Sequence, residues 1–307
     1  MKKTRKITHL SQDAREALNL GDDERISRVV FLLRSEAWIP YPRAKAILSR
    51  LEELFNLPRP RQDVLKSYRI PNLLMISDTN NGKTHLLNRF YDLHPKENNP
   101  DADASYAPVI SVEVDSPSLD NFYNLVLMFL GAVFREKDRV EVKAFQTLKL
   151  MRQVGTRILM IDELSTAIAG TSLKQRTFLN GLKYLGNRSH VSIVGAGTRE
   201  VFSALRLVPQ LDNRFERAEL KRWEFGADFR KLLESFEYIL PLRNPSELQE
   251  PTLAMKLFSM TEGYIGELSN LLMEAAAHAI RTGSEKIDHK LLKQIAWKAP
   301  SERLKNL

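Results

Sequence analysis

Short apolar runs alternate with longer amphipathic segments through the middle of the chain, between residues 70 and 225. The apolar runs occupy residues 72–77, 109–114, 157–162 and 191–195. Because most of their positions are apolar on both alternating faces, they predict strands of a parallel sheet that is covered on both sides. The segments between the runs are long enough for crossover helices, so the pattern predicts an α/β domain.

Helical periodicity dominates the two ends of the chain. Near the N-terminus it covers residues 22–34 and 43–55, on either side of the helix-breaking sequence Ile39-Pro-Tyr-Pro42. After Gly226 the strand pattern ends, and helical patterns occupy residues 228–240, 251–261, 266–282 and 288–298. We therefore expect a helical extension with a basic arm, an α/β core and a small all-helical domain, over residues 1–69, 70–225 and 226–307.

The longest apolar run, residues 125–134, falls short of the roughly 18 to 20 residues that cross a bilayer. We expect a buried core helix there and no membrane segment. Polar residues follow the basic start Met1-Lys-Lys-Thr-Arg-Lys6, which argues against a secretory signal. The chain has no cysteine, which excludes a disulfide framework, a thiolate metal site and a cysteine nucleophile and favours a cytoplasmic location.

The 46 Lys and Arg outnumber the 38 Asp and Glu, which gives a net charge of +8. An excess of positive charge is typical of proteins with a polyanionic partner such as nucleic acid. Many proteins without such a partner are mildly basic, so the net charge supports nucleic-acid binding only together with a more specific signal.

The strand over residues 72–77 runs into a loop and then an apolar helix pattern. The loop matches the phosphate-binding pattern G-x-x-x-x-G-K-[ST], except that Ser77 replaces the first glycine. Gly82 lets the backbone approach phosphates, and Lys83 supplies positive charge to the β- and γ-phosphates. Thr84 would place its hydroxyl on Mg²⁺. We predict that ATP and Mg²⁺ are bound by Ser77, Asp78, Thr79, Asn80, Asn81, Gly82, Lys83, Thr84 and His85.

Two carboxylates, Asp162 and Glu163, end the strand over residues 157–162, about 80 residues after the loop. Open α/β sheets bind ligands at the carboxyl ends of their strands. We predict that Asp162 holds Mg²⁺ with Thr84 and that Glu163 polarises the attacking water. A pair of solvated residues at a strand end is the alternative, and it would be preferred if the phosphate loop were absent.

Three further side chains complete the predicted catalytic set. Thr198 follows the strand over residues 191–195 and is the candidate sensor of the γ-phosphate. Arg214 and Arg217 are candidates to reach the γ-phosphate of a neighbouring subunit, which would require an oligomer. The alternative for both arginines is a surface helix in which they pair with Glu216 and Glu219.

With these elements, the sequence resembles the AAA+ ATPases, and more narrowly the TniB/TnsC family of transposition regulators of Tn7-like and Tn5053-like elements, including CRISPR-associated transposons. The resemblance extends from about residue 40 to residue 295. It is carried by the phosphate loop, by Ile161-Asp-Glu163, by Val194-Gly-Ala-Gly-Thr-Arg-Glu200, by the lid sequence over residues 261–272 and by the run over residues 43–55.

The resemblance implies an AAA+ P-loop fold with a parallel-sheet core followed by a small all-helical lid, in a bacterial protein. It implies a Mg²⁺-dependent ATPase that oligomerises as a ring or filament on double-stranded DNA and links a TniQ-like target-selection protein to the transposase. ATP hydrolysis would then drive disassembly. Many AAA+ lids carry a sensor arginine after the Gly-x-x-Gly turn, whereas this chain has Glu267 there.

DNA contacts are expected from basic residues of the N-terminal arm and of the segment over residues 135–143. The resemblance also implies contacts from two serines of an inner loop and from the surroundings of Lys143. The expected set is Lys2, Lys3, Arg5, Lys6, Ser116, Ser118, Arg139 and Lys143. Each assignment competes with an ordinary solvated surface. A helicase loader, another AAA+ DNA-remodelling ATPase and a DNA scaffold that binds ATP without hydrolysing it stay open as alternatives.

Overall fold

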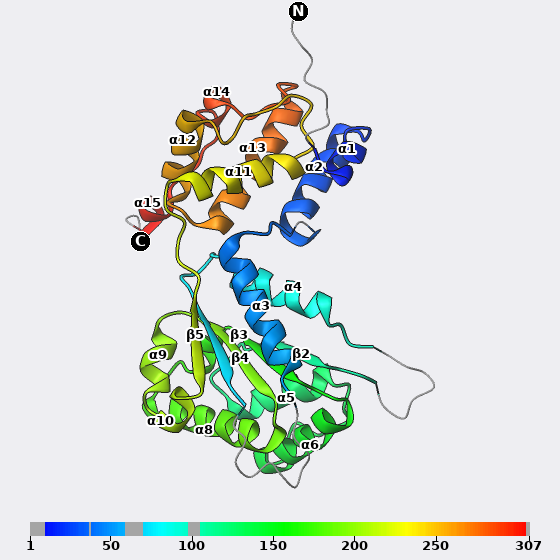
Figure 1. Ribbon diagram of the computed structural model, residues 1–307, viewed down its shortest axis with the longest axis vertical. Coiled ribbons are helices and arrows are strands. Elements are labelled where there is room, and N and C mark those ends of the chain that lie inside the picture. Colours follow the sequence, from blue (N-terminus) through cyan, green and yellow to red (C-terminus); the bar gives the residue numbers. More distant parts are fainter. Residues whose placement is uncertain (1–9, 37, 59–69, 98–104, 305–307) are drawn as a thin grey trace, which may run out of the picture. The chain divides into compact units, whose positions relative to one another are not determined.

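The computed structural model describes residues 10–36, 38–58, 70–97 and 105–304. The chain forms two compact units, one from residues 1–41 together with 222–307 and one from residues 42–221 (Figure 1). We call them the helical unit and the α/β unit. The division into three segments at residues 69/70 and 225/226 stays a prediction.

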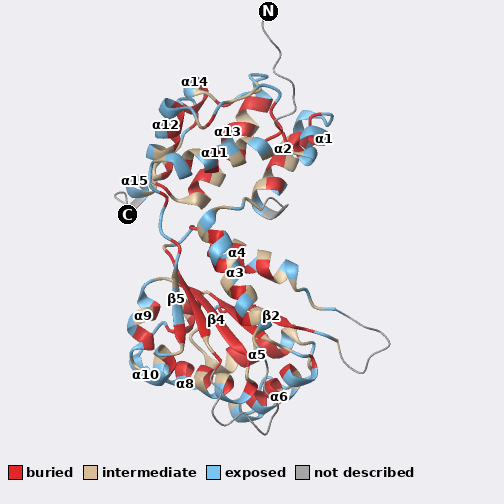
Figure 2. Ribbon diagram, in the orientation of Figure 1, coloured by how far each residue is buried: buried red, intermediate tan, exposed pale blue. Residues whose placement is uncertain are grey.

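A five-stranded parallel sheet with the strand order β2-β3-β4-β1-β5 forms the centre of the α/β unit. The strands are β1 (Asn72–Ile76), β2 (Val109–Glu113), β3 (Ile158–Asp162), β4 (Ser192–Gly197) and β5 (Phe215–Glu219). Every residue of β1, β3 and β4 is buried, as Figure 2 shows in red. The four strands predicted from apolar runs are confirmed, and their mostly apolar or small residues suit a sheet that is covered on both faces.

The fifth strand, β5, was not predicted from the sequence. It pairs with β1 alone, with Asn72 opposite Phe215 and Ile76 opposite Glu219, and is therefore an edge strand. Of its five residues only Phe215 is buried, so it lacks the continuous apolar run of the other strands. The alternative of a surface helix around Arg214 and Arg217 is wrong, because the backbone here pairs with β1.

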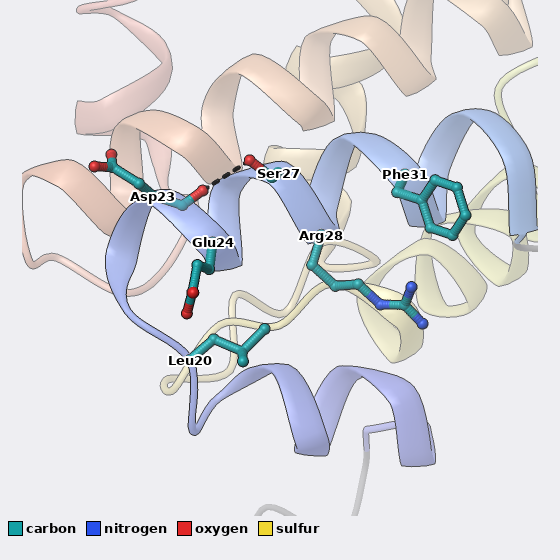
Figure 3. Close-up of a pocket in the computed structure, with 6 residues that line it drawn as sticks. All are labelled: Leu20, Asp23, Glu24, Ser27, Arg28 and Phe31. Carbon is teal, nitrogen blue, oxygen red and sulfur yellow. Dashed lines mark hydrogen bonds between the residues drawn. The ribbon is translucent and has the colours of Figure 1, made fainter.

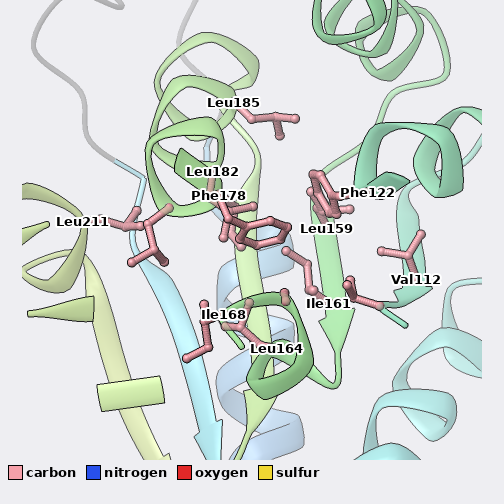
Figure 4. Packing of buried hydrophobic residues seen from close by; sticks show 14 of the residues in the cluster. Val112, Phe122, Leu159, Ile161, Leu164, Ile168, Phe178, Leu182, Leu185 and Leu211 are labelled. Atoms are coloured by element: carbon pink, nitrogen blue, oxygen red, sulfur yellow. The ribbon is translucent and has the colours of Figure 1, made fainter. Parts of the chain in front are cut away.

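Helices flank the sheet and bury its apolar faces. They are α3 (Pro42–Asn56), α4 (Lys83–Leu93), α5 (Leu119–Phe129), α6 (Val140–Gln153), α7 (Leu164–Ala167), α8 (Ser172–Ser189), α9 (Glu200–Leu205) and α10 (Pro209–Asp212). Phe122 of α5 and Phe178 of α8 meet edge to face, with ring centroids 5.4 Å apart, beside Leu159 and Ile161 of β3 (Figure 4). This core supports the carboxyl end of β3, where the two predicted carboxylates lie.

The apolar run over residues 125–134 is only partly a core helix. The helix α5 ends at Phe129, and Val133 beyond it is 95% exposed. The expected buried helix is therefore correct for the first half of the run and wrong for the second. Within the described part of the chain, no helix combines the length and apolar character that a membrane span requires.

The helical unit consists of α1 (Gln12–Ala17), α2 (Asp22–Phe31), a π-helical turn (Leu32–Glu36), α11 (Ala227–Ile239), α12 (Pro251–Thr261), α13 (Ile265–Arg281), α14 (His289–Leu292) and α15 (Pro300–Leu304). Val29 of α2 is buried in the same core as Leu268 and Leu272 of α13. The fully buried Arg25 of α2 also forms an ion pair with Glu285. These contacts explain why the N-terminal helices belong to this unit. The helix expected over residues 288–298 is much shorter, since α14 ends at Leu292.

Candidate nucleotide site

The phosphate loop connects the end of β1 to the first residue of α4. Gly82 has a φ of 88°, a left-handed conformation that glycine adopts without steric cost. Lys83 is only 6% exposed, and its Nζ donates hydrogen bonds to the carbonyl oxygens of Ser77 at 3.1 Å and Asp78 at 3.0 Å. The lysine therefore lies across the loop, and the N-terminus of an 11-residue helix follows it. This arrangement is suited to binding an anion.

Ser77 occupies the first glycine position of the pattern without a positive φ. Its amide donates to the Gly197 carbonyl at 3.2 Å, and its hydroxyl donates to the Asp78 carbonyl at 2.9 Å. A side chain is therefore accommodated and paired at this position, and the departure from the pattern leaves the loop intact.

Thr84 and Asp162, which are 78 positions apart in the sequence, are in direct contact. The Thr84 hydroxyl donates to Asp162 Oδ2 at 2.6 Å, while Asp162 Oδ1 accepts the Glu163 amide at 2.9 Å. A hydroxyl and one carboxylate are hard oxygen donors of the kind that Mg²⁺ uses when phosphates and waters complete its shell. The described residues contain no cluster of three His, Cys, Asp or Glu that would hold a metal alone. The donors present thus fit Mg²⁺ that is bound together with a nucleotide.

Burial lowers the pKa of Lys83 below its ordinary value of 10.5. The negative charges of Glu163, Asp162 and Asp78 act in the opposite direction and favour the protonated amine. The three carboxylates are therefore close enough to Lys83 to influence its charge. A bound phosphate would reinforce the same effect.

Glu163 is the N-cap residue before α7 and has a left-handed backbone, at φ 52° and ψ 40°. A residue with a side chain adopts this conformation at a cost of roughly 1–2 kcal/mol, and such residues cluster at functional sites. The conformation turns the chain sharply at the end of β3.

Thr198 is held by Ser165, a residue that sequence reasoning missed. The Ser165 hydroxyl oxygen accepts the Thr198 amide at 2.7 Å and lies 2.9 Å from the Thr198 hydroxyl, which in turn donates to Glu200. This hydrogen bond lowers the pKa of Glu200. A Cβ on Gly197 would lie 2.8 Å from the Ser165 hydroxyl oxygen, so only glycine lets α7 approach β4 this closely. No pattern in the sequence singles out Ser165, because its contacts are entirely tertiary.

Arg214 lies at the amino ends of the strands, whereas the phosphate loop lies at their carboxyl ends. Its carbonyl accepts the amide of Asn72, the first residue of β1, whereas the loop follows the last residue of that strand. The five residues of β1 separate these two ends of the sheet by roughly 17 Å. Arg214 donates to Asn187 Oδ1 at 2.5 Å and lines a cavity of about 420 Å³ with Ile70, Pro71, Gln210, Asn213 and Glu216. Arg214 therefore does not face the phosphate loop of its own chain.

The acidic partners expected for the two arginines are occupied by other residues. Glu216 pairs with Arg50, and Glu219 pairs with Arg199. Arg217 instead pairs with Asp212 at 3.2 Å, and its guanidinium lies 4.7 Å from the Phe202 ring centroid. Arg217 is thus engaged within its own chain.

A comparison with protein families agrees with this geometry. The family described as bacterial TniB protein matches residues 28–225, which is more than half of the chain. The chain belongs to the TniB family. No curated protein matches it.

Solved structures with a similar fold include ORC and Cdc6 proteins. ORC2 of Aeropyrum pernix, in ADPNP-ADP complexes, superposes with a TM-score of 0.62 at 12% identity, covering 90% of this chain and 74% of that chain. Cdc6p of Pyrobaculum aerophilum gives 0.58 at 15% identity, with 90% and 74% covered. ORC1 of Aeropyrum pernix in complex with DNA gives 0.53 at 16% identity, with 90% and 69% covered. The expected AAA+ P-loop fold of this TniB-family chain is confirmed.

Two of the residues expected to contact DNA in this TniB-family chain take part in local hydrogen bonds. The Ser118 hydroxyl caps α5 by accepting the Asn121 amide at 3.2 Å, and the Ser116 hydroxyl accepts Asn121 Nδ2 at 3.1 Å. Arg139 is exposed at the N-cap of α6. Lys2, Lys3, Arg5 and Lys6 lie outside the described residues.

The assignment of Lys143 to the DNA-facing set is contradicted by its burial. Lys143 is 0% exposed, and its Nζ donates at 2.7 Å both to Asp120 and to the carbonyl of Glu136. The charge is therefore neutralised inside the protein and fastens α6 to α5. From the sequence, a lysine in a charged segment is expected at the surface. Only the fold shows that Lys143 is paired with Asp120.

Glu267, which occupies the position of a lid sensor arginine, is likewise paired. It lies in the first turn of α13, is 8% exposed and accepts hydrogen bonds from the Arg303 guanidinium of α15. The Arg303 guanidinium also lies 5.3 Å from the Trp297 ring centroid. The carboxylate thus has a structural role in attaching α15 to the helical unit.

A depression lies between α1 and α2 of the helical unit (Figure 3). Its volume is about 450 Å³. It is lined by Leu20, Asp23, Glu24, Ser27, Arg28 and Phe31. Two carboxylates among six lining residues do not suit a phosphate group, so the nucleotide site is assigned to the loop of the α/β unit.

Proposed function

We propose that this TniB-family chain is an ATP-dependent, DNA-binding regulator of DNA transposition. It assembles with ATP on double-stranded DNA, links a TniQ-like target-selection protein to the transposase and disassembles when ATP is hydrolysed. The TniB family match and the AAA+ fold support this proposal. The observation that carries the ATPase part is the contact of Thr84 with Asp162 beside the buried Lys83.

Each residue of the site has a distinct role in the proposed hydrolysis. Lys83 and the loop amides bind the phosphate oxygens, and Thr84 and Asp162 hold the metal. Bound Mg²⁺ would neutralise charge that develops on the transferred phosphoryl group. Glu163 orients the attacking water and accepts its proton. The Thr198 hydroxyl, which donates to Glu200 in this structure, would instead donate its hydrogen bond to a phosphate oxygen.

The position of Arg214 supports an oligomeric mechanism, because it lies at the amino ends of the strands and the phosphate loop of its own chain lies at the carboxyl ends. An arginine that stabilises transferring phosphate from a neighbouring subunit contributes strongly to the rate of phosphoryl transfer. We therefore propose that Arg214 completes the site of the next copy in a ring or filament. The structurally similar ORC2 and ORC1 proteins were solved with ADPNP and ADP and with DNA, respectively, and they support nucleotide and DNA binding here.

Binding to duplex DNA is supported by the net charge of +8 and by exposed basic residues such as Arg139. Phosphate contacts from lysine and arginine are independent of sequence and weaken steeply with salt. In an oligomer, a modest number of contacts for each subunit is repeated along the DNA. We therefore expect tight binding only where the protein assembles.

The test compares Thr84→Val, which removes the hydroxyl at nearly constant volume, with Thr84→Ser, which keeps it. Mg²⁺-dependent phosphate release in the presence of duplex DNA should be lost in Thr84→Val and largely retained in Thr84→Ser. Equal rates in both variants and the parent would refute the proposed metal site.

A Glu163→Gln variant tests the link between hydrolysis and disassembly. It should bind ATP, form filaments or rings on duplex DNA and keep them, as seen by electron microscopy over time. Assemblies that dissociate at the parent rate would contradict the role of Glu163. A parent protein that assembles with ATP but releases no phosphate would instead establish the alternative of a non-hydrolysing scaffold. Binding of a helicase and failure to bind transposase would favour a helicase loader.

A further inference from the structure

Two peptide bonds connect the two units, since both boundaries fall between consecutive residues. The chain enters the α/β unit between Tyr41 and Pro42 and returns to the helical unit between Lys221 and Arg222. On the helical side, the rings of Tyr41 and Trp223 pack edge to face with centroids 5.1 Å apart. Side chains that hold residues 220 and 221 therefore act directly on the second passage.

Two side chains hold successive backbone carbonyls immediately before that passage. Asn81 Nδ2 donates to the Leu220 carbonyl at 2.7 Å, and Arg43 Nη1 donates to the Lys221 carbonyl at 2.8 Å. The Leu220 amide also donates to the Ile76 carbonyl at 2.8 Å. The segment is thus fastened to the phosphate loop, to the end of β1 and to the first turn of α3.

Asn81 makes this attachment dependent on the phosphate loop. It directly precedes Gly82, is 3% exposed and spans 139 positions of the sequence with its hydrogen bond. Its Oδ1 is buried and has no hydrogen-bond partner among the described residues, so the side chain is held by the Leu220 contact. The loop binds anions through backbone amides, which leaves the Asn81 side chain outside the anion nest. Any ordering of the loop around phosphates therefore also orders the donor that holds Leu220.

We propose that Asn81 is a positioning residue that transmits the occupancy of the phosphate loop to residues 220–222, through which the chain enters the helical unit. Arg43 is the second clamp on the same segment. The inference rests on the proposed binding of nucleotide at this loop. When nucleotide orders the loop, the Asn81–Leu220 hydrogen bond forms more persistently and the passage becomes more rigid.

The experiment measures amide hydrogen exchange of the peptide over residues 218–224, with and without AMP-PNP and Mg²⁺, by mass spectrometry. The nucleotide is supplied at concentrations that saturate each protein in a parallel titration with a fluorescent ATP analogue. The variants are Asn81→Leu, which removes the donor at similar size, and Arg43→Ala, which removes the second clamp and leaves the loop unchanged. Lys45→Ala, an exposed lysine on α3, is the matched control.

In the parent and in Lys45→Ala, nucleotide should slow exchange of this peptide by about fivefold, the effect of one net hydrogen bond. The slowing should disappear in Asn81→Leu and decrease in Arg43→Ala. A parent that binds nucleotide without any change in this peptide overturns the relay and leaves the proposed function standing. Parent-like slowing in Asn81→Leu also overturns it. If Asn81→Leu fails to bind nucleotide, Asn81→Ala, which also lacks the donor to Leu220, is measured in its place, and parent-like slowing there rejects the relay. A parent that binds no nucleotide refutes the proposed function itself.

Discussion

Removal of the Ser165 hydroxyl should slow ATP hydrolysis without weakening nucleotide binding. In Ser165→Ala, the Thr198 amide and hydroxyl lose partners that lie at 2.7 and 2.9 Å. Two neutral hydrogen bonds contribute about 1–3 kcal/mol in total. If they position Thr198 for the transition state, kcat should fall by roughly fivefold to a hundredfold. KM should change little, because Lys83 and the loop amides are not touched.

The assay is steady-state phosphate release with Mg²⁺ and duplex DNA, combined with thermal unfolding to establish that each variant is folded. Ser203→Ala on α9, where the serine is exposed, is the matched control and should behave as the parent. Thr198→Val removes the sensor hydroxyl, and the Ser165→Ala/Thr198→Val double variant should be no slower than Thr198→Val alone if Ser165 acts through Thr198. A folded Ser165→Ala protein with the parent kcat, or fully additive effects in the double variant, would refute the reasoning.

Four other predictions follow from the charges of the structure. Because burial lowers the pKa of Lys83, affinity for a fluorescent ATP analogue should fall as pH rises through a range below the ordinary lysine value of 10.5. Lys83→Arg should not show this fall. A parent affinity that stays constant up to the ordinary lysine value would contradict the prediction. Without nucleotide, the unfolded state binds more protons in this range, so Lys83 should make stability rise with pH there, as chemical unfolding will show. Arg214→Ala and Lys83→Ala subunits should each be inactive and regain phosphate release when mixed, whereas an Arg214→Ala protein as active as the parent would reject action in trans. Arg303→Ala, which deprives the largely buried Glu267 of its ion pair, should lower the melting temperature by about 2–6 °C, from a loss of about 1–2 kcal/mol for a pair with one half-exposed partner. Adding Glu267→Gln to this variant should restore part of the loss. Equal melting temperatures for the parent and Arg303→Ala would exclude the pair as a stabilising contact.

The central strands and the nucleotide loop were predictable because their signals are local. A strand covered on both faces favours apolar or small residues, and β1, β3 and β4 have them at every position except Asn72, Asp162 and Ser192. The order of strand, loop and helix around Gly82 and Lys83 reflects a backbone path that few residue types allow. The carboxyl ends of parallel strands meet at one edge, so the position of Asp162 at the end of β3 already placed it near Thr84.

The remaining features depended on partners that are distant in the sequence. The strand β5 exists because β1 offers it backbone hydrogen bonds, although its own residues are mostly polar. Lys143 is buried and Glu267 is tolerated because Asp120 and Arg303 neutralise them. When each of these residues is considered alone, its charge predicts a position at the surface.

By itself, the sequence of this TniB-family chain determined which segments must be buried, where phosphates can bind and which carboxylates lie beside them. Those properties follow from local polarity and backbone freedom. Only the tertiary structure decided how the parts are held: Ser165 beside Thr198, Asn81 on Leu220 and Arg214 at the far edge of the sheet. Each of these arrangements is a hydrogen bond between segments that approach one another only after the sheet has formed, and no spacing along the chain encodes them.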